Sequence, residues 1–359
     1  MKPLLRDINP TDWPTLLAQK GFPSYRGRQL AHWLYARGAM SWDAMHNLPR
    51  DVRAALAAIY DASGARINER QSAQDGTRKF LLQMRDGHDC ESVIIPMNRH
   101  ATFCVSSQIG CAMACSFCAT ARGGLARNLS CGEIVEQVQI LAADLAAAPF
   151  ARHGERAYNV VFMGMGEPLD NFAAVAQAIR ILTDPAGLGL SPQRIQISTS
   201  APPHALEQLA AFELPVGLTI SLGGTDDASR RKLMPVAGRA GVAAVLDAAA
   251  RYADRVDRRA TIAWILIAGQ TDAPAQALQL AQLVARRPFK VNLIPLNRLD
   301  QSVLTAPSRE RILAFQRVLI DAGVPAFIRD SGGQDIDAAC GQLRRRRLAK
   351  RDSSEAQSH

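Results

Sequence analysis

The stretch FCVSSQIGCAMACSFC, residues 103–118, decides how this sequence is interpreted. Its first residues predict a buried strand, and Cys111, Cys115 and Cys118 follow in a CxxxCxxC spacing, where a loop at the carboxyl end of that strand is expected. Three soft thiolates this close together suit an iron–sulfur cluster or zinc. A structural zinc site uses four ligands, and no CxxC or HxxxH pair elsewhere completes such a set. Three cysteines leave one corner of a [4Fe-4S] cluster open for a small chelating ligand; a zinc knuckle or unrelated buried thiols are the alternatives.

Apolar strands alternate with amphipathic helices from Phe103 onward. The predicted strands are 103–107, 159–163, 194–198, 217–222, 261–267, 290–296 and 326–329, and the predicted helices are 130–147, 172–183, 204–212, 240–254, 274–286 and 308–323. Repeated strand–helix units imply a parallel sheet, and about six of them suit a partly open barrel. We therefore predict an α/β fold with a partial (β/α)6 barrel, whose ligands bind at the carboxyl ends of the strands.

The flanking segments have a different character. Residues 1–60 predict an N-terminal helical accessory domain with the basic residues Arg26, Arg28 and Arg37, and we expect it to contact RNA. Residues 61–98 predict a strand-rich connector, with runs at 78–84 and 91–97 around an Asp86-Gly87 turn. The barrel and a C-terminal cysteine segment then occupy 99–343, and 344–359 form a basic tail without apolar periodicity, which we expect to be disordered.

The net charge indicates what kind of molecule this protein binds, and the number of cysteines indicates how they are used. The chain of 359 residues has 42 Lys and Arg against 33 Asp and Glu, a formal net charge of +9. This excess favours a polyanionic partner, because Lys and Arg that neutralise phosphates release counterions. Seven cysteines, an odd number, favour metal binding or catalysis over a disulfide framework. No apolar run approaches the roughly 18 residues that span a bilayer, and no signal-peptide core precedes the first charges and prolines. We expect a cytoplasmic monomer without membrane contact.

Polar residues follow several of the predicted strands and predict a binding site where those strands end. Gly164, Gly166 and Glu167 end the strand NVVFM, and the glycines leave room for a ligand to approach the backbone. Glu167 is able to accept hydrogen bonds from an ammonium group. Three further polar residues, Ser198, Ser221 and Asn297, end later strands. Each alone is typical of a cap or a turn, but together they predict one cofactor wall.

The chain resembles the RlmN/Cfr family of radical-SAM RNA adenosine methyltransferases over nearly its whole length. The resemblance is carried by FCVSSQIGCAMACSFCAT, RNLSCGEI, FMGMGEP, ISTS, VNLIPLN and DIDAACGQL, in the family's order and at about its spacings. It implies a [4Fe-4S] cluster on the three cysteines and methylation of a ring carbon, C2 or C8, of an adenosine in large-subunit ribosomal RNA; some members also modify transfer RNA. It also implies contacts to S-adenosylmethionine (SAM) from Gly166, Glu167, Ser198, Ser221, Leu222, Gly223 and Asn297.

The same resemblance implies a methyl relay that uses two SAM molecules per turnover. Cys340 receives a methyl group from one SAM, and a 5′-deoxyadenosyl radical from the second SAM takes a hydrogen from that methyl. The resulting methylene radical adds to adenine. Glu91 resembles the family's general base, and Cys104 resembles the thiol that attacks the bridging sulfur. A Cys104–Cys340 disulfide remains for an external reductant to open.

Two departures from the family predict a divergent paralogue, with segments that lean towards the Cfr branch. The run Ser221-Leu222-Gly223 ends in glycine where the family usually has His, and the segment after Asn297 lacks a Pro/Gly-rich loop. One alternative is a radical-SAM methyltransferase acting on a different RNA. Another is an iron–sulfur or zinc RNA-binding protein without turnover, for which Cys104, Cys340 and Glu91 would be unnecessary.

Overall fold

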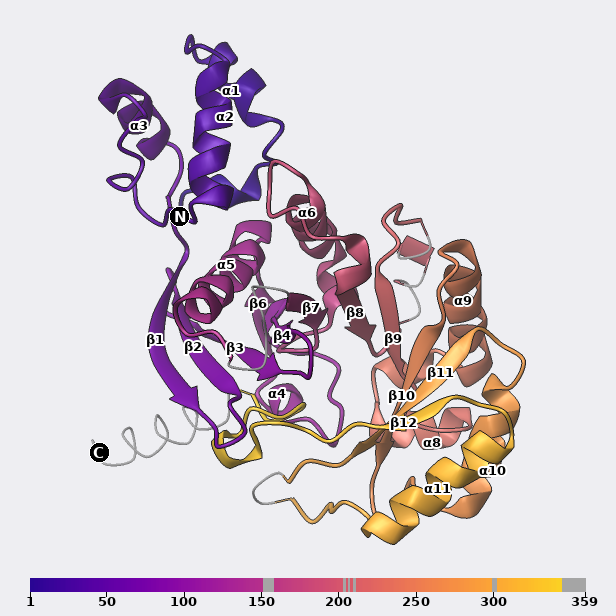
Figure 1. Ribbon diagram of the computed structural model, residues 1–359. Coiled ribbons are helices and arrows are strands. Elements are labelled where there is room, and N and C mark those ends of the chain that lie inside the picture. The colour runs from indigo at the N-terminus through magenta and orange to yellow at the C-terminus, as the bar shows by residue number, and fades with distance from the viewer. Residues whose placement is uncertain (151–157, 203–204, 206, 209–210, 299–301, 344–359) are drawn as a thin grey trace.

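A ten-stranded sheet forms the centre of the computed structural model, which describes residues 1–150, 158–202, 205, 207–208, 211–298 and 302–343 (Figure 1). The strand order is β1-β2-β3-β4-β7-β8-β9-β10-β11-β12. Pairing is antiparallel from β1 to β4 and parallel from β4 to β12. The parallel strands follow one another in chain order, joined by six crossovers, which confirms the predicted partial barrel.

All seven predicted barrel strands are present. They are β4 (Ala101–Cys104), β7 (Tyr158–Phe162), β8 (Ile195–Thr199), β9 (Gly217–Ser221), β10 (Ala260–Leu266), β11 (Phe289–Pro295) and β12 (Ala326–Ile328). The major barrel helices are α5 (Cys131–Ala147), α6 (Phe172–Thr183), α9 (Val242–Arg255), α10 (Pro274–Val284) and α11 (Arg309–Asp321). Two short helices, α4 (Ala119–Arg122) and α8 (Asp227–Leu233), lie beside the strand ends. Four of the nine residues of the helix predicted at 204–212, namely 204, 206, 209 and 210, lie outside the described residues.

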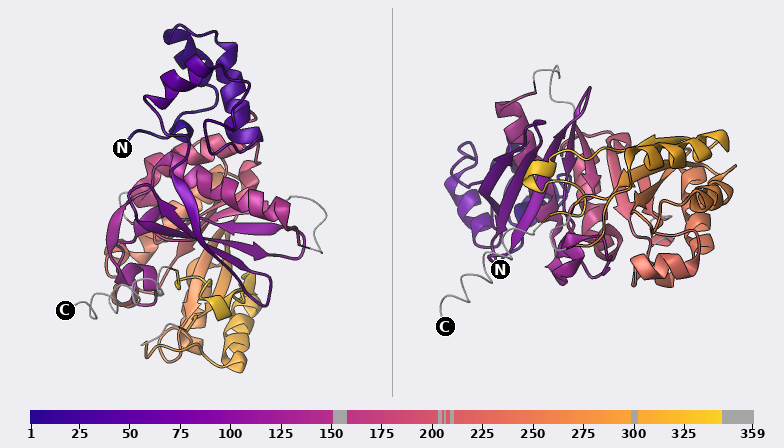
Figure 2. Two further views of the ribbon diagram at one scale, coloured as in Figure 1. Left: turned by 90° about the vertical axis from the view of Figure 1, so that its left-hand side faces the viewer. Right: turned by 90° about the horizontal axis from the view of Figure 1, so that it is seen from below.

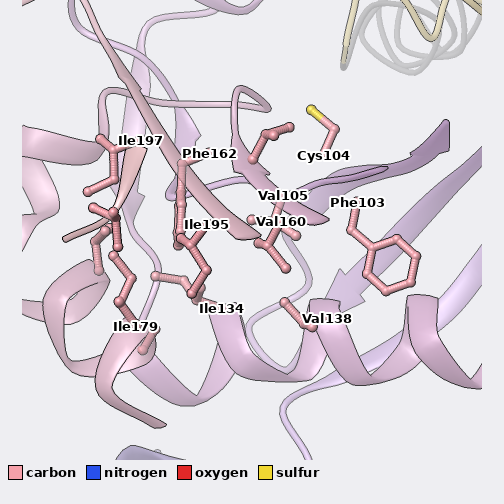
Figure 3. Close-up of a cluster of buried hydrophobic side chains, with 14 of the residues drawn as sticks. Phe103, Cys104, Val105, Ile134, Val138, Val160, Phe162, Ile179, Ile195 and Ile197 are labelled. Carbon is pink, nitrogen blue, oxygen red and sulfur yellow. The ribbon is translucent and has the colours of Figure 1, made fainter. Parts of the chain in front are cut away.

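Local sequence explains where α5 begins and which face it buries. The Ser130 hydroxyl accepts the N–H of Glu133 at 3.2 Å, and the Glu133 carboxylate accepts the N–H of Ser130 at 2.9 Å, a capping box that satisfies two free donors. Ile134 and Val138 then point into the apolar core between α5 and the sheet (Figure 3). The sulfur of Cys104 points to the opposite side of β4 from this core (Figure 3).

Three antiparallel strands widen the sheet beyond the barrel. They are β1 (Ala65–Ser72), β2 (Arg78–Met84) and β3 (Asp89–Pro96). β2 and β3 agree with the predicted runs, whereas β1 was not predicted because its residues are mainly exposed and polar, without apolar alternation. The short pair β5 (Gln108–Gly110) and β6 (Leu125–Asn128) was not predicted either, because strands this short do not show an alternating pattern in the sequence. No described helix is both long and apolar enough to cross a membrane.

The N-terminal helices α1 (Trp13–Gln19), α2 (Tyr25–Ala31) and α3 (Arg50–Ala57) stand at one end of the molecule, next to α5 and α6 (Figures 1 and 2). This agrees with the helices expected there. The domain boundaries at 60 and 98 stay predictions, and the tail 344–359 lies outside the described residues.

A fully buried arginine joins these helices to the barrel. Arg6 lies 3.5 Å from the carboxylate of Glu136 on α5, and both side chains are 0% exposed. Its guanidinium also donates to the carbonyl oxygens of Ala62 and Ala39, at 2.7 and 2.6 Å. The other oxygen of Glu136 accepts the N–H of Gly64 at 2.7 Å. Because Arg presents several donors in a fixed fork, one side chain holds backbone from two segments against α5.

We predict that Arg6→Met lowers the free energy of unfolding by about 3 to 5 kcal/mol, because it leaves the buried Glu136 carboxylate without its cation. Urea unfolding followed by circular dichroism measures the change. Arg28→Met is the matched control: Arg28 is exposed on α2 and its replacement should alter stability by less than about 0.5 kcal/mol. Equal stability of the Arg6 variant and the control would contradict the anchoring role.

Candidate active site

A cavity of about 390 Å³ lies at the carboxyl ends of the parallel strands. Most of the predicted site residues line it: Cys104, Cys111, Cys115, Cys118, Gly166, Glu167, Ser198, Ser221, Asn297 and Cys340. The predicted residues Glu91, Leu222 and Gly223 are outside the lining. Residues from every barrel strand thus meet at one place, as expected for parallel strands whose carboxyl ends share one edge.

The cysteine loop, residues 111–118, has one wall of apolar side chains. Met113 packs there with Leu233 and Met234, which come from the end of α8. The N–H of Ser116 donates to the carbonyl of Leu233 at 3.0 Å, so α8 supports the loop directly. Ala114 adopts a left-handed conformation with φ of 54°, which costs an alanine about 1 to 2 kcal/mol. The surrounding structure therefore imposes the shape of this loop.

The three loop thiols have the chemistry of soft metal ligands. Burial raises the pKa of Cys111 to about 12 and also raises the pKa of Cys115. Metal binding deprotonates such thiols outright, because the cation replaces the lost solvation. Among the described residues, no three His, Cys, Asp or Glu side chains stand close enough to hold a single metal ion together. The three thiols nevertheless share the cavity wall, and a cluster binds each thiolate to a different iron.

The carboxylate of Glu167, which also lines the cavity, is held by hydrogen bonds from the chain itself. One oxygen accepts the N–H and the hydroxyl of Ser200, at 2.8 and 2.7 Å, and the other accepts the N–H of Leu169 at 3.1 Å. Burial raises the pKa of Glu167 above its ordinary value, against these hydrogen bonds. Ser200 was not predicted as a site residue. It comes directly after β8, and the predicted residue Ser198 is the last but one residue of that strand. These three hydrogen bonds fix the position of the carboxylate.

Gly164 and Gly166, which follow β7, are required for a different reason from the predicted one, which was room for a ligand to approach the backbone. A Cβ at Gly164 would lie 2.7 Å from the carbonyl oxygen of Val105, and one at Gly166 would lie 2.6 Å from the Cβ of Gln108. Gly166 also has a φ of 102°, which only glycine adopts without strain. The missing side chains therefore make room for the protein's own residues 105–108, while Gly166 still borders the cavity.

The departure at Gly223 is accommodated by a methionine. Gly223 has a φ of 74°, and a Cβ there would lie 2.4 Å from the sulfur of Met234, a residue that lines the cavity. Met234 thus fills the space beside position 223. The side chain of Leu222 is fully buried, so any contact of these two residues with a cofactor would use backbone atoms. Their role as cofactor contacts stays a prediction.

The C-terminal strap, residues 332–343, runs from the end of β12 back across the sheet to β2 and β3 (Figures 1 and 2). The Asp75 carboxylate accepts the N–H of Gly333 at 2.8 Å. The side-chain amide of Asn297 donates to the carbonyl of Cys340 at 3.0 Å. The N–H of Ala119, next to the cysteine loop, donates to the carbonyl of Gly341 at 2.6 Å. These bonds place the accessible thiol of Cys340 in the same cavity as Cys104 and the cysteine loop.

Glu91 lies on β3 beside the strap. Val93 pairs with Cys104 across the sheet, and strand alternation puts Glu91 on the same face as both. Its carboxylate is 7% exposed and lies 3.6 Å from the Nζ of Lys79, which also donates to the carbonyl of Asp337 at 3.4 Å. Burial raises the pKa of Glu91 to about 7, although the Lys79 charge opposes the rise. Lys79 was not predicted, because nothing in the run RKFLLQM distinguishes it from a surface lysine.

Comparison with known proteins agrees with this geometry. Residues 105–281 match the Radical SAM superfamily, and residues 5–61 match the ribosomal RNA large subunit methyltransferase N-terminal domain. The partial barrel and its cysteine loop are those of a radical SAM enzyme, a class that uses a [4Fe-4S] cluster and SAM. A crystal structure of a radical SAM methyltransferase from Sphaerobacter thermophilus is 39% identical, with a TM-score of 0.90 over 95% of this chain and 99% of that one.

Two curated relatives define the family within this class. A probable dual-specificity RNA methyltransferase RlmN from Moorella thermoacetica is 43% identical over 95% of this chain and 96% of its own. The dual-specificity RNA methyltransferase RlmN from Wolinella succinogenes is 40% identical over 91% of this chain and 94% of its own. The chain belongs to the RlmN family of radical SAM methyltransferases. Its predicted lean towards the Cfr branch stays a prediction.

We predict that Lys79→Met raises the pKa of Glu91 above about 7, because the cation that favours the carboxylate is lost. When the pKa of Glu91 is higher in the folded state than in the unfolded state, binding of a proton stabilises the folded state. This contribution to stability is present at low pH and is lost as the pH rises through the folded-state pKa. The variant should therefore lose stability between pH 6 and pH 8.5 relative to the wild type, by about 1.4 kcal/mol per unit of added pKa shift.

Urea unfolding at several pH values measures this effect, and Lys79→Arg, which keeps the charge, is the control. Parallel pH profiles for the wild type and Lys79→Met would show that Lys79 does not set the ionisation of Glu91.

Proposed function

We propose that this protein methylates a ring carbon of adenosine in ribosomal RNA and transfer RNA through a methyl relay between two cysteines. Its relatives are named as dual-specificity RNA methyltransferases, and that specificity is carried over here. The observation that supports the relay most directly is that Cys104 and Cys340, from segments 236 positions apart, line one cavity together with the cysteine loop. An RNA-binding protein without turnover would have no use for this convergence.

The loop residues Cys111, Cys115 and Cys118 would hold the [4Fe-4S] cluster through their thiolates. When bound, the cluster supplies the reductive cleavage of SAM. Glu167, Ser198, Ser221 and Asn297 stand around the same cavity, where polar atoms at the strand ends would orient the amino acid part and the sugar of SAM. Two SAM molecules are used per turnover, because one donates the methyl group and the other starts the radical step.

The remaining side chains divide the relay among them. The Cys340 sulfur takes the methyl group from the first SAM, and S-adenosylhomocysteine leaves. Once the methylene radical has added to adenine, the adduct gives up one electron, which the oxidised cluster would accept, and Glu91 removes the proton from the substituted ring carbon; its pKa of about 7 lets it accept a proton near neutral pH. The Cys104 thiolate then attacks the Cys340 sulfur and a disulfide forms; the electron pair of the broken carbon–sulfur bond stays on the methylene carbon, which takes a proton to become the methyl group. An external dithiol then reduces the disulfide.

The RNA partner accounts for the basic character of the chain. Arg28 is exposed and Arg26 is half-buried on α2, within the segment that matches the ribosomal RNA methyltransferase N-terminal domain. We place RNA backbone contacts there, since arginines bind phosphate without reading the base. The protein would act as a monomer in the cytoplasm.

The relay predicts that its two cysteine variants stop at different steps. Cys340→Ala should accept no methyl group, because its acceptor sulfur is gone. Cys104→Ala should still form the bond to adenine but be unable to release it, so protein crosslinked to RNA should accumulate. Denaturing electrophoresis with labelled RNA, and mass spectrometry of the Cys340 peptide, distinguish these states.

Cys131→Ala serves as the control, because this buried thiol lies outside the cavity and should leave turnover intact. Normal turnover by Cys104→Ala, or RNA methylation by Cys340→Ala, would refute the relay.

The cluster assignment predicts that protein reconstituted without oxygen binds one [4Fe-4S] cluster. Replacing Cys111, Cys115 or Cys118 by Ala should abolish both the iron–sulfur absorbance and the reductive cleavage of SAM, whereas Cys131→Ala should retain both. Iron and sulfide analysis measures the stoichiometry. Stoichiometric zinc without iron in the wild type would rule out the assignment.

A further inference from the structure

Arg230, on α8, carries a fully buried guanidinium between the ends of β8 and β9. It donates to the carbonyl oxygens of Ser200 and Leu222 at 2.6 Å and to that of Ser221 at 2.9 Å. The sequence around Arg230 gave no reason to single it out, because further basic residues follow it on the same helix, and these are exposed. Buried charges in proteins are usually paired with an opposite charge, whereas here backbone carbonyls receive these hydrogen bonds.

The carbonyls that Arg230 holds belong to the wall of the candidate active site. The N–H and hydroxyl of Ser200 bind the carboxylate of Glu167, and Ser221 lines the cavity. One guanidinium thereby ties the end of β8 to the end of β9. A lysine has no planar fork and cannot bind all of these carbonyls at once.

The same short helix also supports the cysteine loop. The carbonyl of Leu233 accepts the N–H of Ser116 at 3.0 Å, and Leu233 packs against Cys111 and Met113. Arg230 thus lies one helical turn away from the contact that carries the loop. Movement of α8 would displace the strand ends and the loop together.

The electrostatic surroundings of Arg230 point to the same loop. Burial lowers the pKa of Arg230, while Cys115, once its thiol is ionised, and Asp227 raise it. The Asp227 carboxylate accepts the N–H of Val242 at 2.8 Å. Arginine stays protonated in proteins even when buried. A fixed positive charge therefore lies on the helix that supports a loop whose thiols become anions when they bind iron.

We propose that Arg230 is a positioning residue of the radical SAM site, which joins the strand ends to the cysteine loop and whose fixed charge favours the reduced, more negative state of the cluster. The inference rests on the proposed cluster at Cys111, Cys115 and Cys118. The planar fork of Arg230 joins the strand ends to the loop, whereas its charge acts on the cluster. Different substitutions of Arg230 separate these two effects.

The test compares three variants of the full-length protein, reconstituted without oxygen. Arg230→Gln removes the charge and most of the fork, Arg230→Lys keeps the charge but loses the fork, and Arg231→Gln removes an exposed charge from the same helix. A redox titration followed by electron paramagnetic resonance measures the ratio of reduced to oxidised cluster at a fixed solution potential. Equilibrium dialysis measures the dissociation constant for SAM.

We expect Arg230→Gln to lower the ratio of reduced to oxidised cluster by about tenfold, as for loss of a nearby unit charge in a partly buried site. Arg230→Lys should keep the wild-type ratio but bind SAM more weakly, because the strand ends are no longer held. Arg231→Gln should match the wild type in both measurements, since solvent screens its charge.

An unchanged ratio in Arg230→Gln, or an equal fall in Arg230→Lys, would overturn the charge effect. Wild-type SAM binding by Arg230→Lys would overturn the positioning effect. If Arg230→Gln fails to fold, Arg230→Lys decides both points, because a fall in its ratio contradicts the charge effect and unaltered SAM binding contradicts the positioning. Wild-type protein that takes up no iron would contradict the proposed function as well, whereas a loaded wild type with indifferent Arg230 variants would contradict this inference alone.

Discussion

The backbone hydrogen bonds that hold the C-terminal strap across the strand ends are the interaction on which the candidate chemistry depends. Asp75 grips the start of the strap, Asn297 holds Cys340 itself, and Ala119 binds the next residue, so three distant parts of the chain fix one segment. Most of these donors and acceptors are backbone groups, so the hydrogen bonds fix the course of the strap's main chain. This path brings Cys340 to the cavity that Cys104 also lines.

Buried ionisable groups serve two purposes in this protein. Arg6 and Glu136 form a buried pair that attaches the N-terminal helices to α5, far from the cavity, and their partners complete a closed set of hydrogen bonds. Glu167, with Ser200, lines the cavity, and Glu91, with Lys79, lies beside the strap outside the cavity lining; burial raises the pKa of both carboxyl groups. Burial of ionisable groups therefore has two consequences in this protein. At Arg6 and Glu136 it comes with an ion pair that stabilises the fold, whereas at Glu91 and Glu167 it raises the pKa of a carboxyl group.

The cavity wall depends on close packing as much as on polar groups. Gly164 and Gly166 allow the β7 loop to pack against residues 105–108, which places Glu167 within reach of Ser200. Met234 occupies the space next to Gly223 and also contacts the apolar support of the cysteine loop. A larger residue at position 223 would have to displace this methionine, so the departure from the family pattern is coupled to the packing of α8.

The sequence by itself determined what local pattern and spacing control: the order of barrel strands and helices, the capping box that starts α5, and the cysteine loop after the first barrel strand. The resemblance to a family supplied the roles assigned to Cys104, Cys340 and Glu91. Tertiary structure alone decided that β1 joins the sheet through polar residues, and that Lys79 and Arg230 lie buried beside the cavity. These features depend on partners brought together by the sheet and the strap, such as Lys79 with Asp337, and separation along the chain leaves no periodic signal of such contacts.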